Sequence, residues 1–360
     1  MRFILTFNND NRGVGPLTAL LHHQGHSVLH LALSGHQPLL TRPDYRARAA
    51  GKLRELVADQ AVDVWIGMFE EVFFLAADAP SPRVGVLTNA PDVYARLHRK
   101  RSAAAFNLEH QLPHVPTIVP DARTTADALP AAWRNRPCLL KEDDSRGGYG
   151  TRIFADAETM WRATRPDERA RAVIQPWWSG RHWVLQGIFN RGELVDAEVL
   201  VKQSLWDDRH TVRYLLYHRA VDSPGAEDLL RRAGRAARWN GMLEFECLGD
   251  EGDLRILEYN PRFSGDFLHT VYTGSSFGAN TIRTYAGLPP VPRTGARAGV
   301  TRCEGLGRRA IRRQLSKRPA ALLDARWVLE WARLERERRA TKSPASAARH
   351  RPEARWALLS

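Results

Sequence analysis

Cysteine is scarce in this sequence. The 360 residues contain only three, Cys138, Cys247 and Cys303, and these lie far apart. An odd number of widely spaced cysteines predicts neither a disulfide framework nor a zinc site. Such a set fits a reducing compartment, where thiols stay unpaired. We therefore expect a cytoplasmic protein.

Long apolar runs are also missing. No stretch approaches the roughly 18 apolar residues that a transmembrane helix needs. The opening MRFILTF is too short for the hydrophobic region of a signal peptide. A hydrophobic content of 43% with 26% charged residues is ordinary for a soluble globular protein. A chain of 360 residues is long enough for two or three domains.

Acidic residues are outnumbered, with 40 Asp and Glu against 53 Lys and Arg and a net charge of +13. The excess gathers after Arg293, in GRRAIRRQLSKR and LERERRATK. Such runs can lie against nucleic acid or an anionic membrane. Few aromatics separate them, and nothing there resembles a known nucleic-acid module. A solvated helical segment is the favoured interpretation, so nucleic acid is not an expected partner. A homodimer is compatible with the sequence.

The first 95 residues show strands alternating with helices. Apolar runs predict strands at 3–7, 28–33, 62–67 and 82–88. Helical patterns fall between them, through Leu17 to Leu21 and over 45–57. This alternation is typical of an α/β domain with a parallel sheet.

The middle of the chain has a different pattern. Longer strands follow one another with few helices between them, which predicts an antiparallel sheet and hence an α+β region. One basic helix is expected over 226–239. The expected strands cover 138–141, 153–154, 173–175, 182–190, 193–204, 210–221, 242–249 and 254–260.

The segment LLKEDDSRGGYGTRIF, residues 139–154, combines a strand, a lysine and a glycine-rich turn. Glycines let backbone N–H groups approach phosphate oxygens, and a lysine adds a positive charge. The order GxxxxGK[ST] of a P-loop is absent. The segment is therefore either a phosphate-binding turn or a plain glycine-rich hairpin.

The segment GMLEFECLGDEGDLRILEYNPRFSG, residues 241–265, predicts a hairpin rich in oxygen ligands. Because side chains alternate along a strand, Glu244 and Glu246 share one face, and Glu258 and Asn260 share a face of the partner strand. Carboxylates with an amide suit Mg²⁺ and nucleotide phosphates. The alternative is an exposed hairpin with acidic side chains.

The segment VIQPWWSGRHW, residues 173–183, has the features of a hinge strand. Pro176 offers a carbonyl but no N–H, and Trp178 offers an N–H. This pair of groups matches the edge of an adenine ring. A buried pair of tryptophans in the core is the competing interpretation.

In this order the three segments resemble the ATP-grasp superfamily, in particular the ATP-grasp domains of biotin carboxylase and carbamoyl-phosphate synthase. The resemblance implies an N-terminal parallel-sheet domain, a small lid subdomain and an antiparallel large subdomain. It places a first lysine in YARLHRKRSAAAF, before the LPHVPT turn, and a second lysine before the lid. The ATP-binding residues implied are Lys100, Lys141, Ser145, Gly147, Gly148, Gly150, Gln175, Pro176, Trp178 and His182. The implied metal ligands are Glu246, Glu258 and Asn260, and the implied catalytic residues are Arg262 and Lys141.

Two points depart from the family pattern or stay open within it. The lid of the family commonly has lysine-proline and then glycine-serine, whereas here Glu142 and 143–146 (DDSR) stand before the glycines. The family's first metal-binding glutamate usually lies five residues after a glycine, which favours Glu246 after Gly241. Glu244 remains the second choice.

The resemblance implies an ADP-forming ligase that uses ATP and Mg²⁺, with Mn²⁺ able to substitute. A carboxylate would be activated as an acyl phosphate and joined to an amine, both of them small molecules. The alternatives are a bicarbonate-dependent carboxylase or carbamoyl-type enzyme and a nucleotide-binding regulator with a degenerate site. Lys202, His210 and Arg213 are candidates to bind the substrate carboxylate. The expected boundaries are 1–95 for the N-terminal domain, 96–176 for the lid, 177–292 for the large subdomain and 293–360 for a basic helical segment.

Overall fold

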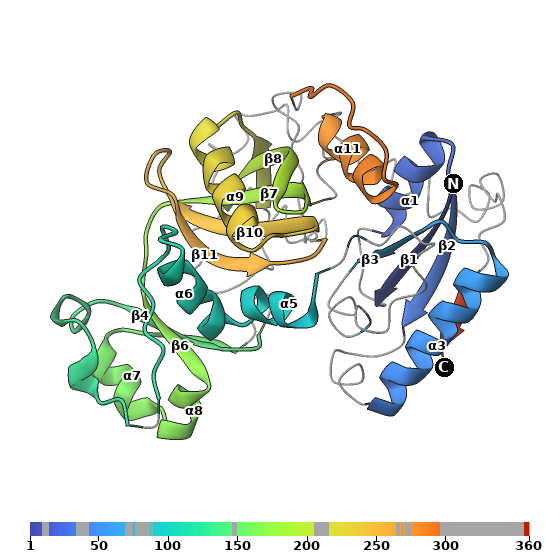
Figure 1. The fold of residues 1–360 in the computed structure, drawn as a ribbon. Coiled ribbons are helices and arrows are strands. Elements are labelled where there is room, and N and C mark those ends of the chain that lie inside the picture. Colours follow the sequence, from blue (N-terminus) through green and yellow to red (C-terminus); the bar gives the residue numbers. More distant parts are fainter. Residues whose placement is uncertain are drawn as a thin grey trace, which may run out of the picture.

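Three separate sheets organise the computed structural model of the chain (Figure 1). The structure describes residues 1–8, 14–33, 43–68, 75, 87, 89–121, 123–145, 150–204, 216–263, 267, 270, 275–295 and 356–359. Within these ranges no helix is both long enough and apolar enough to cross a bilayer.

The N-terminal sheet is parallel, with strand order β12-β2-β1-β3. Its first three strands are β1 (Arg2–Asn8), β2 (Ser27–Leu33) and β3 (Val64–Gly67), connected through α1 (Val14–His23) and α3 (Pro43–Asp59). Parallel strands need crossover connections, which are usually helices, so the alternation of strands and helices in the sequence predicts this parallel pairing. The predicted α/β class is confirmed here, while the strand expected at 82–88 lies outside the described residues except for Leu87.

The fourth strand of this sheet comes from the other end of the chain. β12 (Trp356–Leu359) pairs in parallel with β2, with Trp356 opposite His30. The expected helical segment 293–360 therefore ends in a strand, and its residues 296–355 lie outside the described part of the chain. A strand of four residues is too short to show a sequence pattern of its own. The basic stretch before it suggested a helical segment up to the end of the chain.

The large sheet is antiparallel, in the order β11-β10-β7-β8-β9. One face packs against α5 (Pro91–His98), α6 (Lys100–Glu109) and α9 (Pro224–Ala236). That face supplies core residues such as Trp183, Leu243 and Phe245, all buried. The strands are β7 (Arg181–Asn190), β8 (Glu193–Ser204), β9 (Leu216–Ala220), β10 (Gly241–Gly249) and β11 (Arg255–Asn260).

The small sheet forms a subdomain with a core of its own, at the lower left of Figure 1. It has the order β5-β4-β6, from β4 (Cys138–Glu142), β5 (Thr151–Phe154) and β6 (Ala172–Pro176). Around it lie α7 (Ala157–Ala163), α8 (Pro166–Ala170) and the short 3₁₀ turns η2 (Ala126–Ala128) and η3 (Ala131–Trp133). The predicted combination of a parallel-sheet domain, a small lid and an antiparallel large subdomain is confirmed.

A β-bulge in β11 sets which side chains face the core. Glu246 pairs with Glu258 and the next residue, Cys247, pairs with Ile256, so Leu257 is an extra residue in β11. Without the bulge, Ile256 and Tyr259 would lie on opposite faces, because they are three residues apart. With it both residues enter the core, and Glu258 keeps the opposite, polar face.

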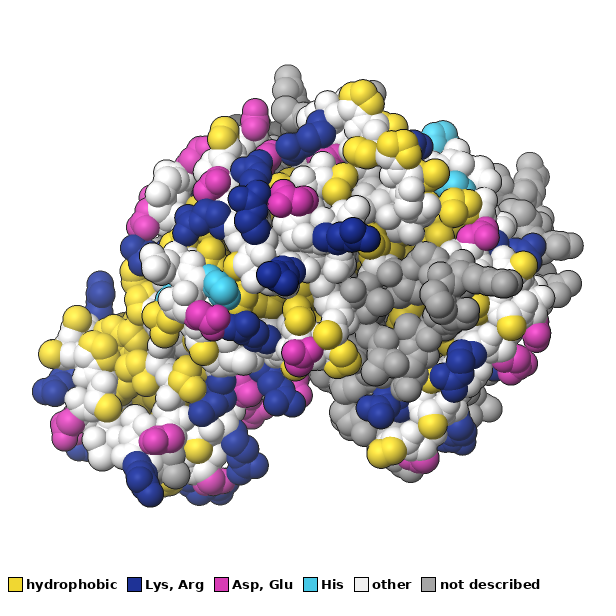
Figure 2. Space-filling view, viewed as in Figure 1, with side chains coloured by type: hydrophobic (Ala, Val, Ile, Leu, Met, Phe, Trp, Pro, Cys, Tyr) yellow, Lys and Arg dark blue, Asp and Glu magenta, His cyan; other side chains and the backbone are white. Residues whose placement is uncertain are grey.

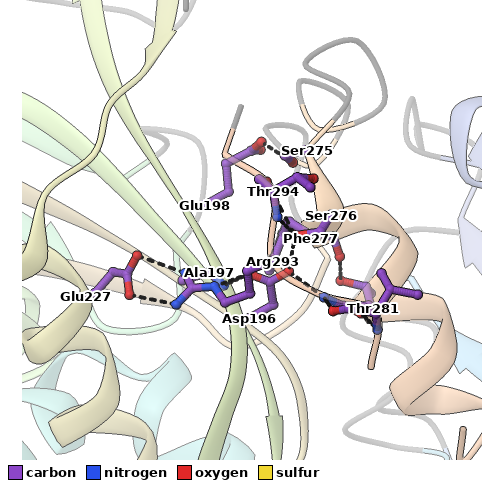
Figure 3. Close-up of polar contacts among 12 residues, drawn as sticks. Asp196, Ala197, Glu198, Glu227, Ser275, Ser276, Phe277, Thr281, Arg293 and Thr294 are labelled. Atoms are coloured by element: carbon purple, nitrogen blue, oxygen red, sulfur yellow. Dashed lines mark hydrogen bonds and ion pairs between the residues drawn. The ribbon is translucent and has the colours of Figure 1, made fainter. Parts of the chain in front are cut away.

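A buried polar network fastens α11 (Ser276–Tyr285) and the chain after it to β8 (Figure 3). Asp196 is 1% exposed and accepts hydrogen bonds from Ser276, Asn280 and Arg293. Arg293 also forms a two-pronged contact with Glu227 on α9. The boundary expected after residue 292 thus falls inside a network that belongs to the large subdomain.

Two glycines of α9 offer a matched test of its packing. A Cβ on Gly234 would lie 2.0 Å from the buried Phe189 ring, whereas a Cβ on Gly225 would meet nothing within 4 Å. We expect Gly234→Ala to lower the free energy of unfolding by about 1–3 kcal/mol, through overpacking. Gly225→Ala should leave it unchanged or raise it by up to about 1 kcal/mol. Urea denaturation measures both, and equal effects would contradict this packing.

Candidate active site

A pocket lies where α6, the turn after β4 and β11 meet. Its lining joins residues from all three sequence segments, which are far apart in the chain. Of the residues expected at the site, Lys100, Ser145, Gln175, Glu258, Asn260 and Arg262 line it.

Lys100 connects α6 to the turn that precedes the glycines. Its ammonium group donates to the backbone carbonyl and the hydroxyl of Ser145. Burial lowers the pKa of Lys100, while Glu258 is the strongest of the carboxylates that act against this shift. The first lysine expected from the sequence therefore sits beside the expected metal hairpin.

The acidic residues that depart from the family lid have partners in the protein. Asp143 accepts the backbone N–H of Arg101 at 2.8 Å, so it caps the first turn of α6. Asp144 contacts His98 at 3.0 Å. The two acidic side chains anchor the turn to α5 and α6, and these contacts explain their presence next to the glycine-rich turn without a metal ion.

Lys141 lies on β4 and is 8% exposed. Burial lowers the pKa of its ammonium group, and the opposing attraction comes chiefly from Glu258 and also from Glu246. A lysine of the small sheet thus lies within electrostatic reach of the hairpin of the large sheet. The lowered pKa shows that desolvation outweighs this attraction.

The glycine-rich turn is described only at its ends. Gly150 has a φ of +69°, and a Cβ there would lie 2.6 Å from the carboxylate of Glu142, so this position requires glycine. Gly147 and Gly148, which were expected to bind ATP, lie outside the described residues.

Gln175 on β6 presents an unpaired acceptor at this pocket. Its amide nitrogen donates to the Thr117 hydroxyl at 2.9 Å, and that hydroxyl donates to the Val115 carbonyl at 2.7 Å. This relay fixes the amide orientation, because the hydroxyl proton is already used. Within the described residues the buried Oε1 of Gln175 has no hydrogen-bond partner, so it suits a ligand that carries an N–H donor.

Of the remaining hinge residues, Pro176 belongs to the small sheet and Trp178 contacts the large sheet. Pro176 ends β6 opposite Cys138, and the backbone N–H of Trp177 donates to the Pro137 carbonyl at 2.6 Å. The indole of Trp178 lies against the Arg255 guanidinium, 4.9 Å from it. Trp178 therefore contacts β11 through Arg255. The alternative interpretation required a pair of tryptophans buried in the core, which this contact does not match.

Glu244 is fully buried in β10 and contacts two amides. Its Oε1 accepts from Asn260 and its Oε2 from Gln186, both at 3.0 Å. The register places Glu244 directly opposite Asn260. The amide N–H of Asn260 therefore faces the carboxylate of Glu244, and both side chains lie on the hairpin face that also holds Glu258.

Glu246 instead contacts a lysine and a histidine. Its Oε1 lies 2.6 Å from the ammonium of Lys202, and its Oε2 lies 2.6 Å from Nε2 of His182. Burial alone would raise the pKa of Glu246, but the charges of Lys202 and His182 outweigh it and hold the pKa well below its ordinary value. The geometry therefore favours Glu244 over Glu246 as the partner of Asn260, against the spacing argument.

No ready-made cluster of three His, Cys, Asp or Glu side chains for a metal occurs within the described ranges. Glu258 and Asn260 line the pocket, and Arg262 lies beside them.

Sequence reasoning missed two side chains of this site. Gln186 was not considered, although its alternation with His182 along β7 puts both on one face. Thr117 was seen only as part of the turn LPHVPT. His210 and Arg213, the other carboxylate-binding candidates beside Lys202, lie outside the described residues.

Comparison with known proteins gives matches in structure alone. No protein-family model matches the sequence, and a search of curated proteins found no match. An L-amino acid ligase from Bacillus licheniformis superposes with a TM-score of 0.59 at 12% identity, over 81% of this chain and 74% of the ligase. The chain has the ATP-grasp fold.

Two further structures with this fold carry ligands. A carboxyaminoimidazole ribonucleotide synthase from Aspergillus clavatus, complexed with ATP, has a TM-score of 0.60 at 14% identity, over 83% of this chain and 80% of the synthase. The second is the biotin carboxylase domain of a Hydrogenobacter thermophilus 2-oxoglutarate carboxylase, in complex with MgADP and bicarbonate. It has a TM-score of 0.56 at 17% identity, over 79% of this chain and 69% of the carboxylase domain. The ATP-grasp resemblance seen in the sequence is confirmed at the level of the fold.

The lowered pKa of Lys141 predicts a stability effect. Between that pKa and the value of about 10.4 in the unfolded chain, the unfolded state binds more protons, so stability rises with pH. Lys141→Met removes the buried charge and should stabilise the protein by about 0.5–2 kcal/mol at pH 7. This advantage should shrink between pH 7 and pH 10.

Thermal unfolding of wild type and variant across this pH range measures the difference. Lys52→Met serves as the control, because Lys52 is a surface lysine of α3 paired with Glu55. A Lys141→Met advantage that is absent at pH 7, or that grows with pH, would contradict the assignment.

Proposed function

We propose that this chain is an ATP-dependent, ADP-forming ligase that activates a carboxylate as an acyl phosphate and joins it to an amine. One observation carries the proposal. Lys100, Glu258 and Asn260 line one pocket, and Glu258 lies within electrostatic reach both of Lys100 and of Lys141 in the small sheet. Cations and oxygen ligands arranged in this way suit a polyphosphate with a divalent cation.

The nucleotide would lie between the small and the large sheet. The Oε1 of Gln175, which has no partner among the described residues, fits the amino group of an adenine. Pro176 and Trp178, which follow Gln175 in the chain, would complete the hinge. His182 would face the ribose. Lys100 and Lys141, with Ser145 and the glycines 147, 148 and 150, would hold the phosphates.

Mg²⁺ fits the oxygen donors of the hairpin, and we propose Glu244, Glu258 and Asn260 as its protein ligands. The oxygens of both carboxylates are engaged, and the choice of Glu244 rests on its partners. Neutral amides of Asn260 and Gln186 hold Glu244, whereas the Lys202 ammonium and His182 hold Glu246. When bound, the ion would neutralise charge on the phosphate oxygens. Mn²⁺ has similar ligand preferences and should substitute.

The protein's part in the reaction would be to position groups and to neutralise charge. The substrate carboxylate attacks the γ-phosphorus of ATP, breaking its bond to ADP, and the amine then displaces phosphate from the acyl phosphate. Lys141 and Arg262 would balance the charge that develops on the transferred phosphoryl group. No side-chain nucleophile is needed, and the two described cysteines are buried thiols.

Small molecules are the expected substrates. On the face shown in Figure 2, basic side chains lie among acidic and hydrophobic ones on both lobes, which differs from the continuous basic stripe typical of nucleic-acid binding. The use of ATP and the presence of two described cysteines without a disulfide are both consistent with a protein that works in the cytoplasm. A bicarbonate-dependent reaction is the second candidate, since one structure with the same fold holds bicarbonate.

A trapping assay tests the proposal. The enzyme is incubated with ATP, Mg²⁺ and pools of amino acids or other small carboxylates, and phosphate and ADP are measured. Hydroxylamine should convert the acyl phosphate into a hydroxamate. Release that needs both an acid and an amine supports the ligase. Release that needs bicarbonate alone supports the second candidate, and binding of ATP without any release supports a regulator.

Glu258 gives the sharpest loss of activity. Glu258→Ala removes a proposed metal ligand from the pocket and should lower ADP release at least about a hundredfold, or roughly 2.7 kcal/mol of barrier. Circular dichroism should show the fold intact, because the side chain lies on the polar face of β11. Glu251→Ala, at the exposed hairpin tip, is the control and should have no effect. Turnover that survives Glu258→Ala would remove the basis of the metal site.

A further inference from the structure

The contact between Lys202 and Glu246 spans three strands of the large sheet. β7 lies between β10 and β8, and Glu246 is opposite Val184 in the register while Lys202 is opposite His182. Neighbouring strands are about 4.8 Å apart, so β8 and β10 are separated by about 10 Å. The Lys202 side chain must therefore extend across β7 to place its ammonium 2.6 Å from Glu246.

The contact brings a positive charge next to the pocket. Glu258, which lines the pocket, is directly opposite Glu246 in the β10–β11 register. Glu246 also lies within electrostatic reach of Lys141 in the small sheet. The ammonium of Lys202 is thus held at the β10 side of the space between the two sheets, although its backbone belongs to β8.

Stability alone gives little reason for this arrangement. Lys202 and Glu246 are only 10% and 14% exposed, and His182 is 33% exposed. Removing charged groups from water costs free energy that the pair regains only in part, and buried ion pairs can often be replaced by apolar residues without loss. The Lys202 ammonium lies two strands away from its own backbone, next to Glu246 on β10. A functional role for this positive charge would explain that placement.

We infer that Glu246 is a positioning residue: it contacts His182 and holds the Lys202 ammonium across β7, where that ammonium can reach the phosphates of a bound nucleotide. This inference rests on the proposed function, and it gives Glu246 a role distinct from metal binding. Lys202 would contact a phosphate oxygen, and Glu246 would contact only its two partners.

The test separates position from charge. Glu246→Asp keeps the carboxylate but withdraws it by one methylene group, about 1.5 Å, so Lys202 should lose its place while the net charge stays the same. Lys202→Met removes the proposed phosphate contact. Glu244→Gln is the matched control for metal binding. The non-hydrolysable analogue AMPPNP is titrated by calorimetry into each full-length variant, once with Mg²⁺ and once with EDTA.

We expect Lys202→Met to weaken AMPPNP binding about tenfold and Glu246→Asp to weaken it about three- to fivefold. Both losses should be equal with Mg²⁺ and with EDTA, because a phosphate contact does not depend on the metal. Glu244→Gln should weaken binding only with Mg²⁺. In the Glu246→Asp background, Lys202→Arg should regain at least half of the loss, since its side chain reaches further.

Three results would overturn the inference. A loss for Glu246→Asp that appears only with Mg²⁺ would make Glu246 a metal ligand. A lower melting temperature with unchanged AMPPNP affinity would make the contact purely structural. Unchanged affinity for Lys202→Met would remove the phosphate contact. If wild type does not bind AMPPNP at all, the proposed function fails first, which is a distinguishable outcome.

Discussion

The pairing of β10 with β11 is the constraint on which the candidate site depends. A single extra residue, Leu257, allows Ile256 and Tyr259 to enter the same core while Glu258 and Asn260 face the opposite side. A hairpin without the bulge would have to bury a carboxylate among aromatic rings or expose a large apolar side chain. One bulge therefore places the apolar side chains of β11 in the core and its carboxylate and amide on the opposite face. Lys100 of α6 and Lys141 of β4 lie within electrostatic reach of that carboxylate, Glu258.

The main architecture could be predicted from the sequence because it depends on periodicity. Alternating strands and helices indicated the parallel sheet, and long strands that follow one another, such as β7 and β8 with ten and twelve residues, indicated the antiparallel one. Short elements escaped this reasoning. β12 has four residues after a long basic stretch, and nothing local distinguishes it from the rest of that stretch. The lid departures also became clear only in three dimensions, where Asp143 contacts Arg101 of α6 and Asp144 contacts His98 of α5.

The choice between Glu244 and Glu246 shows where sequence reasoning reached its limit. Both lie on one face of β10, so alternation cannot separate them, and spacing from Gly241 pointed to Glu246. Their difference lies in what the neighbouring strands place beside them, namely amides next to Glu244 and cations next to Glu246. Such cross-strand neighbours follow from register, and register follows from bulges and turns that a single sequence does not specify.

The separate core of the small sheet has a consequence for how this molecule can evolve. Among the described residues, its buried side chains, including Trp133, Leu140 and Met160, form a cluster separate from the two larger ones. Changes in that core alter the lid without disturbing the sheet beneath it. The lid can thus be treated as an exchangeable module, whose own melting behaviour can be tuned independently. A chimera that replaces 119–176 would inherit the large sheet's hairpin intact, together with a cover of different stiffness.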